Sequence, residues 1–423
     1  AVPLKNIKLV AYSAMATDCD NLKRLSKSYL HALEIASETP QSRFSVVSEV
    51  QSLIQFDGEE PADDVVRDKF VLSCTILASS ISSTCDFLST IPHSLAADAG
   101  ATVKTLFPPT SEVMRRVILL LKDKITETSI EGDEISAACA RAPVEFAILA
   151  ANQFRWLVTE MKGEDLEKLI PLVIPCGLTA MDHWSPEVKQ QAMNAFTHLS
   201  KNVNDSSLRF YEDALLDACC KNIVAADEIW ESAVEASVSL STLTQQSNPR
   251  SRWFETLMTE MITHLERQPR NKDRRIAWLK LIDPMMEKMG LVLLAHFKRL
   301  FPLFFVWIHA DDTETVLLSL QRIRTIIRVT WIRHASHFER LVDELAVLYN
   351  EASESRDVIR EEVSSLISLL HHFKVQEPTF REGVVREKSI FLRSYCGTTN
   401  IKEPSFFLYH KGVRYSRFFK ELK

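Results

Sequence analysis

The chain has 423 residues, 46% of them hydrophobic and 25% charged, which is the composition of a folded protein rather than a disordered one. Glycine occurs only 9 times and never twice within ten residues, which excludes the glycine-rich loops that bind dinucleotides and phosphates and argues against a large β protein. The net charge of −6 argues against a general nucleic-acid-binding protein.

The first 163 residues show helical periodicity without a clear repeat. Segments 63–90 and 134–161 are long and apolar enough for helices, and polar turns containing proline or glycine separate the segments of this region. We predict an N-terminal helical region over residues 1–163, made either of divergent repeats or of a separate helical domain.

Residues 164–373 are expected to form repeated helix pairs. In segment 185–199 the apolar residues fall on one stripe of a helix, and the same pattern returns in the second helix of each later pair. The positions that align are Ala192, Ala233, Ala277, Ser319 and Val363. Their spacing in the low forties leaves room for two helices and two turns, which is typical of HEAT or armadillo repeats. We therefore predict an all-α fold, a HEAT/armadillo-like α-solenoid of stacked antiparallel helix pairs.

The most apolar stretch of the chain is segment 291–308. It contains His296, Lys298, Arg299 and Pro302, and its uninterrupted apolar part is shorter than the roughly 20 residues of a membrane-spanning helix. We predict a buried helix here and no contact with a membrane.

Residues 374–423 form a basic and aromatic C-terminal extension. They carry 11 basic and 5 acidic side chains, a net of +6, so residues 1–373 must sum to −12. Opposite charge and nine aromatic residues favour an extension that packs back on the acidic repeats. Docking to an acidic partner and contact with RNA are the alternatives, although no nucleic-acid recognition motif supports the second.

The sequence offers little evidence of chemistry. The eight cysteines are scattered without a C-x-x-C pair, which is typical of free buried thiols in a reducing compartment. His334 and His337 can share a helix face, but no third ligand lies nearby, and no hydrolase or kinase motif is present. We expect no enzymatic activity, no cofactor and no metal site.

One helix carries a candidate protein-binding cluster. Arg324 and Arg328 are four residues apart and share a face, Trp331 lies beside it, and Arg333 follows. Arginine and tryptophan are enriched at protein interfaces. The same pattern also fits a solvent-exposed basic face next to a tryptophan of the core.

Two stretches resemble the Tti-two family. The first contains Leu-Ile-Pro at 169–171, Asp182 and Phe-Tyr-Glu-Asp-Ala-Leu at 210–215, similar to an L-P … D … F-x-D-A-L pattern of that family. The second, residues 320–334, resembles a family helix that ends in Trp-Pro-Arg, with Ile332 in place of the proline. The resemblance covers about residues 165–350.

The resemblance implies a non-catalytic scaffold in the Tel-two/Tti-one/Tti-two (TTT) co-chaperone complex. Such a subunit would bind a large HEAT-repeat subunit resembling Tti-one, a Tel-two-like subunit, the ninety-kilodalton heat-shock chaperone and client kinases related to phosphatidylinositol-3-kinase. It would act in the cytoplasm, with the nucleus as a further compartment. The alternative function is another HEAT/armadillo adaptor, in nuclear transport or as a phosphatase scaffold.

Overall fold

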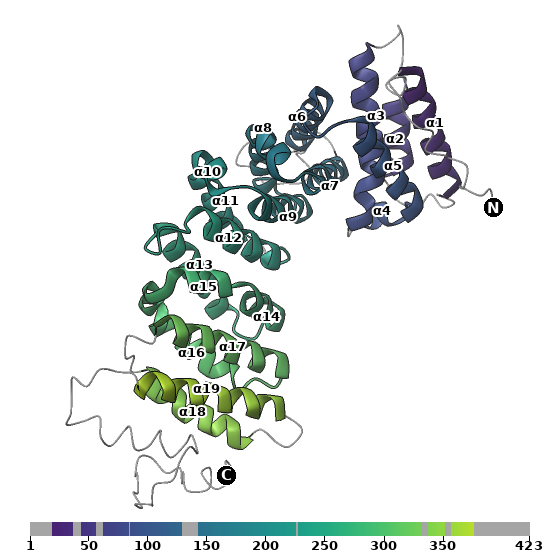
Figure 1. The fold of residues 1–423 in the computed structure, drawn as a ribbon. Coiled ribbons are helices and arrows are strands. Elements are labelled where there is room, and N and C mark those ends of the chain that lie inside the picture. Colours follow the sequence, from purple (N-terminus) through teal and green to yellow (C-terminus); the bar gives the residue numbers. More distant parts are fainter. Residues whose placement is uncertain are drawn as a thin grey trace, which may run out of the picture. The chain divides into compact units, whose positions relative to one another are not determined.

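The computed structural model describes eight stretches of the chain, and their regular structure is helical throughout (Figure 1). The stretches are residues 19–36, 44–55, 62–83, 85–128, 143–225, 227–330, 337–351 and 357–375. The chain divides into two compact units, Ala1–Thr244 and Gln245–Lys423, called here the N-terminal and C-terminal units. The predicted all-α solenoid of stacked helix pairs is confirmed. Of the C-terminal extension predicted over residues 374–423, the first two residues end α19 and the rest lie outside the described residues.

In the N-terminal unit, a first group of helices surrounds α3. The group consists of α1 (Cys19–Ala36), α2 (Val46–Ile54), α3 (Asp63–Ser79), η2 (Ser80–Ser82), α4 (Asp86–Ser89), α5 (His93–Leu106) and α6 (Glu112–Glu127). Helix α3 packs against α1, α2, α5, α6 and α7 (Val144–Glu160). Every residue from Phe70 to Ser79 is buried, so this part of α3 has no solvent-facing side.

The rest of the N-terminal unit is built from two layers of helices. The elements after α7 are α8 (Gly163–Met181), α9 (Pro186–Asn202), α10 (Asp205–Leu208), η4 (Arg209–Tyr211), α11 (Glu212–Ala225) and α12 (Trp230–Thr244). Helices α6, α8, α10 and α11 follow one another in one layer, and α7, α9 and α12 form the other (Figure 1). The boundary predicted after residue 163 falls at the first residue of α8, and α7 and α8 both pack against α9. It stays a prediction of where the regular repeat begins.

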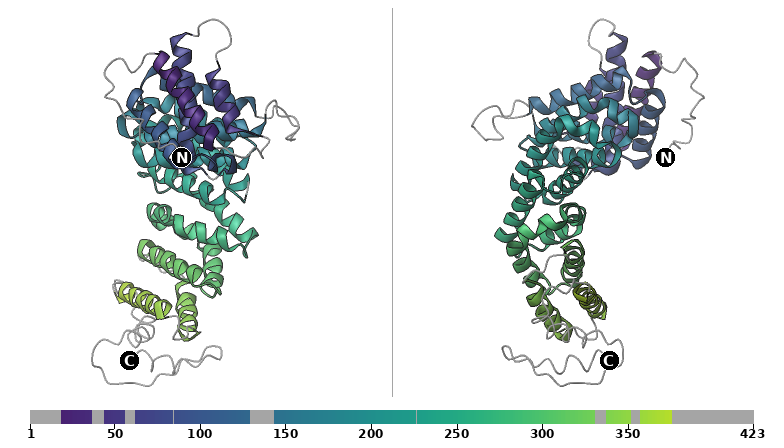
Figure 2. Two further views of the ribbon diagram at one scale, coloured as in Figure 1. Left: turned by 90° about the vertical axis from the view of Figure 1, so that its right-hand side faces the viewer. Right: turned by 60° about the vertical axis from the view of Figure 1, so that its left-hand side comes forward.

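The C-terminal unit repeats the arrangement. Its elements are α13 (Arg252–Arg267), α14 (Lys272–Leu281), α15 (Asp283–Met289), η5 (Gly290–His296), α16 (Phe297–Trp307), α17 (Thr313–Thr330), α18 (His337–Glu351) and α19 (Asp357–Val375). Helices α13, α16 and α18 contact one another in sequence, as do α14, α17 and α19. Figure 2 shows the helices of this unit, coloured green to yellow, stacked in chain order.

The five aligned repeat positions are equivalent in the structure. They lie on α9, α12, α14, α17 and α19, each the second helix of its pair, and all five side chains are buried. Ion pairs join some of these second helices at similar spacing: Lys201 with Glu235 and Arg324 with Glu362. Such half-exposed pairs contribute at most about 1 kcal/mol each, so the shared apolar core supplies most of the stability.

The apolar stretch predicted as a buried helix extends over α15, η5 and α16. By length and composition alone, residues 283–307 could cross a membrane, but half of the most apolar window is buried inside the protein. The Trp307 ring meets Trp278 of α14 edge-on at 5.9 Å, and Phe301 stacks on His337 of α18 at 5.0 Å. These contacts make α16 a core helix, as the sequence predicts.

Close packing between α8 and α9 gives the first testable prediction. A Cβ atom added at Gly177 would lie 2.4 Å from Cζ of the buried Phe196 ring. We expect Gly177→Ala to lower the free energy of unfolding by about 1–3 kcal/mol through overpacking, in spite of a gain of about 1 kcal/mol in helix propensity. Thermal or denaturant unfolding of the full chain measures the effect.

The matched control is Gly100→Ala on α5. Its Cβ would come no closer than 3.2 Å to the Trp156 ring, so we expect a smaller change in stability than at Gly177. Equal or greater stability of Gly177→Ala relative to wild type would contradict the packing described for α8 and α9.

Candidate protein-binding surface

Only part of the predicted arginine and tryptophan cluster falls within the described residues. Arg324 and Arg328 lie on α17, and Trp331 and Arg333 lie outside the described part of the chain. Arg324 is half-buried and Arg328 is exposed, so the two arginines differ although they share a face.

The Arg324 side chain contacts the neighbouring helix α19. Its Nε and Nη2 donate to Glu362 Oε1 at 3.1 and 2.6 Å, and its Nη1 donates to Ser365 Oγ at 3.0 Å. A guanidinium held by three hydrogen bonds within its own unit has fewer donors left for a partner. The structure therefore gives Arg324 a role in joining α17 to α19, whereas the Arg328 side chain is exposed to solvent. The assignment of the cluster to partner binding stays a prediction.

Two further polar side chains of α17 contact the start of α15. Arg322 forms an ion pair with Asp283 at the start of α15, and Thr325 Oγ1 donates to Asp283 Oδ1 at 2.6 Å. Neither acidic partner could be identified from the sequence, because Asp283 and Glu362 lie about forty residues from the arginines of α17 that they contact. A search for side chains of opposite charge that lie about one repeat apart in the sequence could have identified them.

A double-mutant cycle on Arg324 and Glu362 tests this assignment. Both groups are partly exposed, so we expect Arg324→Ala and Glu362→Ala to be coupled by about 0.5–1 kcal/mol in the free energy of unfolding. Arg328→Ala is the matched control and is expected to leave stability unchanged within about 0.5 kcal/mol. A coupling energy of zero would show that the contact between Arg324 and Glu362 does not stabilise the fold.

Groups that could perform chemistry are dispersed or buried in the described part of the chain. No group of three histidine, cysteine or acidic residues there could hold a metal ion, and His334 lies outside it. Burial raises the pKa of the Cys176 and Cys219 thiols to about 12, which keeps both protonated and unreactive. The predicted free thiols Cys139 and Cys396 lie outside the described residues.

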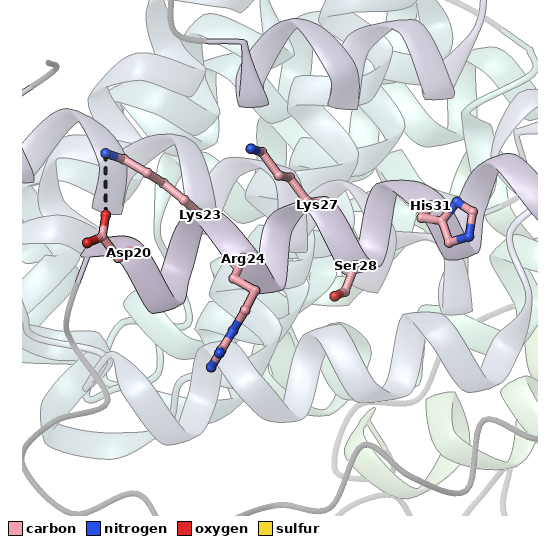
Figure 3. A pocket seen from close by; sticks show the side chains of 6 residues that line it. All are labelled: Asp20, Lys23, Arg24, Lys27, Ser28 and His31. Atoms are coloured by element: carbon pink, nitrogen blue, oxygen red, sulfur yellow. Dashed lines mark ion pairs between the residues drawn. The ribbon is translucent and has the colours of Figure 1, made fainter.

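One shallow, open hollow lies along α1, shown in Figure 3. It is lined by Asp20, Lys23, Arg24, Lys27, Ser28 and His31. All six residues belong to one helix, and in Figure 3 their side chains spread along it rather than converge on one point. Lys23 pairs with Asp20 at 3.8 Å, and Arg24 donates to Asn21 at 2.9 Å. The hollow therefore lacks the convergent polar groups of an enclosed ligand site.

Comparison with known families and proteins identifies one family. The model of the Tti2 family, the Tti-two family that the sequence resembles, matches residues 145–310, from the start of α7 to just beyond α16. An uncharacterized protein of Arabidopsis thaliana is 45% identical over 384 residues, which cover 84% of this chain and 88% of that protein.

Two solved structures show some likeness to this one. A designed armadillo repeat protein is 12% identical and covers 60% of this chain and 99% of its own, with a TM-score of 0.35. Importin beta is 9% identical, and the match covers 89% of this chain and 52% of importin beta, with a TM-score of 0.42. These scores are low, so the description of the fold rests on the helix pairs themselves.

Proposed function

Because the chain belongs to the Tti2 family, we propose that it is a protein-binding subunit of a TTT-type co-chaperone complex that supports the folding and assembly of kinases related to phosphatidylinositol-3-kinase. The family match carries the proposal. It covers helices α7 to α16, which include the first three of the repeated helix pairs.

The way the helices are stacked supports a scaffold. Stacked helix pairs offer a long surface on which buried area and a few anchoring residues provide affinity. Described polar groups such as Arg324 and Glu362 or Arg275 and Asp312 are engaged in contacts between helices. The proposed role is therefore non-catalytic.

The proposed partners are those of the family. They are a large HEAT-repeat subunit resembling Tti-one, a Tel-two-like subunit, the chaperone machinery and the client kinases. We place the complex in the cytoplasm, with the nucleus as a further compartment.

Affinity purification from native extract at moderate salt, followed by mass spectrometry, tests the proposal. We expect two large helical-repeat proteins at fixed stoichiometry, together with chaperone components. An unrelated HEAT-repeat protein purified in the same way is the control for non-specific capture. Recovery of transport factors or phosphatase subunits instead, or of no stoichiometric protein, would contradict the proposed function.

A further inference from the structure

The six cysteines in the described part of the chain fall into two groups. Half of them are buried, and burial raises the pKa of each of these thiols. The other half are partly exposed, in contrast to the buried thiols that the sequence predicts; they are Cys19, Cys85 and Cys220. A reagent from solvent can reach a partly exposed thiol, so these are the described cysteines that can react while the chain stays folded.

Cys85 directly precedes α4 and lies against one face of α7. Asn152 Nδ2 donates to the Cys85 Sγ at 3.6 Å. About one turn further along α7, Arg155 Nη2 donates to the carbonyl and to Oγ of Ser82 at 2.8 and 2.6 Å. Asn152 and Arg155 are three residues apart and therefore share the face of α7 that meets Ser82 and Cys85.

The guanidinium of Arg155 acts on the Cys85 sulfur. Arg155 is only 9% exposed, and burial lowers its pKa, whereas the negative charge of the Cys85 thiolate opposes that shift. By the same interaction the guanidinium favours the thiolate over the thiol, and the thiolate is the nucleophile in exchange with a disulfide. Asp86 follows Cys85 in the chain, but its side chain is exposed, so water screens its charge more than that of the buried arginine.

Two polar atoms of these buried side chains lack a hydrogen-bond partner among the described residues. They are Oδ1 of the fully buried Asn152 and Nε of Arg155. Buried polar groups are nearly always paired, because an unpaired group has given up its bonds to water without replacement. The inner side of the site therefore has an acceptor and a donor to offer to a polar group that becomes joined to the Cys85 sulfur.

The other two partly exposed thiols provide comparisons. The Cys19 thiol donates to the Asp63 carbonyl at 3.8 Å, and its pKa is raised by burial, by this bond and by the charge of Asp63. Cys220 lies on α11 and is half-exposed, as Cys85 is. If exposure alone set the rate of reaction, Cys85 and Cys220 would react equally fast.

We propose that Cys85 is a site of covalent modification that reacts with small disulfides of the glutathione type, while the other described cysteines stay reduced. The Cys85 thiolate attacks one sulfur of the disulfide, whose S–S bond breaks as a new bond forms between that sulfur and the Cys85 Sγ. The second sulfur leaves as a thiolate and takes up the proton that Cys85 released. The Cys85 sulfur is thereby oxidised and the leaving sulfur reduced. The inference does not depend on the proposed function.

Incubation of the folded full chain with oxidised glutathione near neutral pH tests the proposal, with the extent of reaction at each cysteine followed by mass spectrometry of its peptide. We expect the mixed disulfide at Cys85 to form at least about 5-fold faster than the one at Cys220. The buried Cys74 is expected to stay unmodified and reports that the chain is folded. A rate at Cys85 equal to or below that at Cys220 would overturn the proposal.

Substitution of Arg155 tests whether the guanidinium is the positioning group. In Arg155→Gln we expect the rate at Cys85 to fall by about 3-fold near neutral pH and its rise with pH to begin at higher pH, because a smaller fraction of the sulfur is ionised. Arg155→Lys keeps a positive charge and is expected to retain most of the rate. An unchanged rate and pH profile in folded Arg155→Gln would overturn the role of the guanidinium. If Cys74 also reacts, the variant has unfolded, and the wild-type comparison of Cys85 with Cys220 decides alone.

Discussion

Replacing Phe196 with alanine is expected to destabilise the N-terminal unit by about 3–5 kcal/mol, whereas the same substitution at Phe210 should change stability by less than about 0.5 kcal/mol. Phe196 is fully buried on α9 and its ring packs against Gly177 of α8, so its loss leaves a cavity between the two helices. Phe210 is 88% exposed, so its loss removes little contact.

Denaturant unfolding of the full chain, with hydrogen exchange of α8 and α9 as a local probe, measures the difference. We expect faster exchange in both helices of Phe196→Ala and unchanged exchange in Phe210→Ala. Because the two substitutions are chemically identical and belong to the same unit, similar losses of stability would contradict the assignment of these side chains to core and surface.

Acidification from about pH 6.5 to pH 4 is expected to remove up to about 3 kcal/mol of stability through His183 alone. Burial is the main cause that lowers the pKa of His183 to about 4; a hydrogen bond at Thr128 opposes the shift and nearby Lys189 adds to it. Its Nδ1 accepts the backbone N–H of Ser185 at 3.0 Å, so the neutral ring carries its proton on Nε2, which faces Thr128. Protonation of Nδ1 would break the bond to Ser185.

Stability falls with falling pH because the unfolded chain binds a proton at His183 more readily than the folded chain does. Below pH 6.5 the unfolded chain protonates this histidine while the folded chain does not, so the contribution is fully present above pH 6.5 and is lost as the pH falls toward 4. Burial also lowers the pKa of His296, so the test compares wild type with His183→Gln across the same range. We expect a shallower loss of stability in the variant; parallel losses would contradict the buried, neutral state of His183.

The repeated helix pairs could be predicted from the sequence because their signal is local. A helix with one buried face shows its apolar stripe within fifteen residues, and Ala192, Ala233, Ala277, Ser319 and Val363 are all buried as the stripe predicts. The helices around α3 were harder to align. The C-terminal half of α3 is buried on all sides and so has no stripe that could be compared with another repeat.

The binding surface could not be derived in the same way. Whether Arg324 faces a partner or a neighbouring helix depends on Glu362, 38 residues away, and only the packing of α17 on α19 brings them together. Phe210 belongs to a motif that the sequence pattern had singled out, yet its exposure is decided by the short η4 turn, which no periodicity reveals. Whether an apolar residue is exposed depends on how the neighbouring helices pack around it.

The proposed function is tested most directly by the amount of client kinase in cells that lack the protein. We expect depletion of the chain to lower the steady-state levels of the kinases related to phosphatidylinositol-3-kinase without lowering their messenger RNA, and re-expression of the wild-type chain to restore them. Kinase levels that stay unchanged after complete depletion would contradict a role in kinase assembly and leave the chain as a helical-repeat scaffold of another pathway.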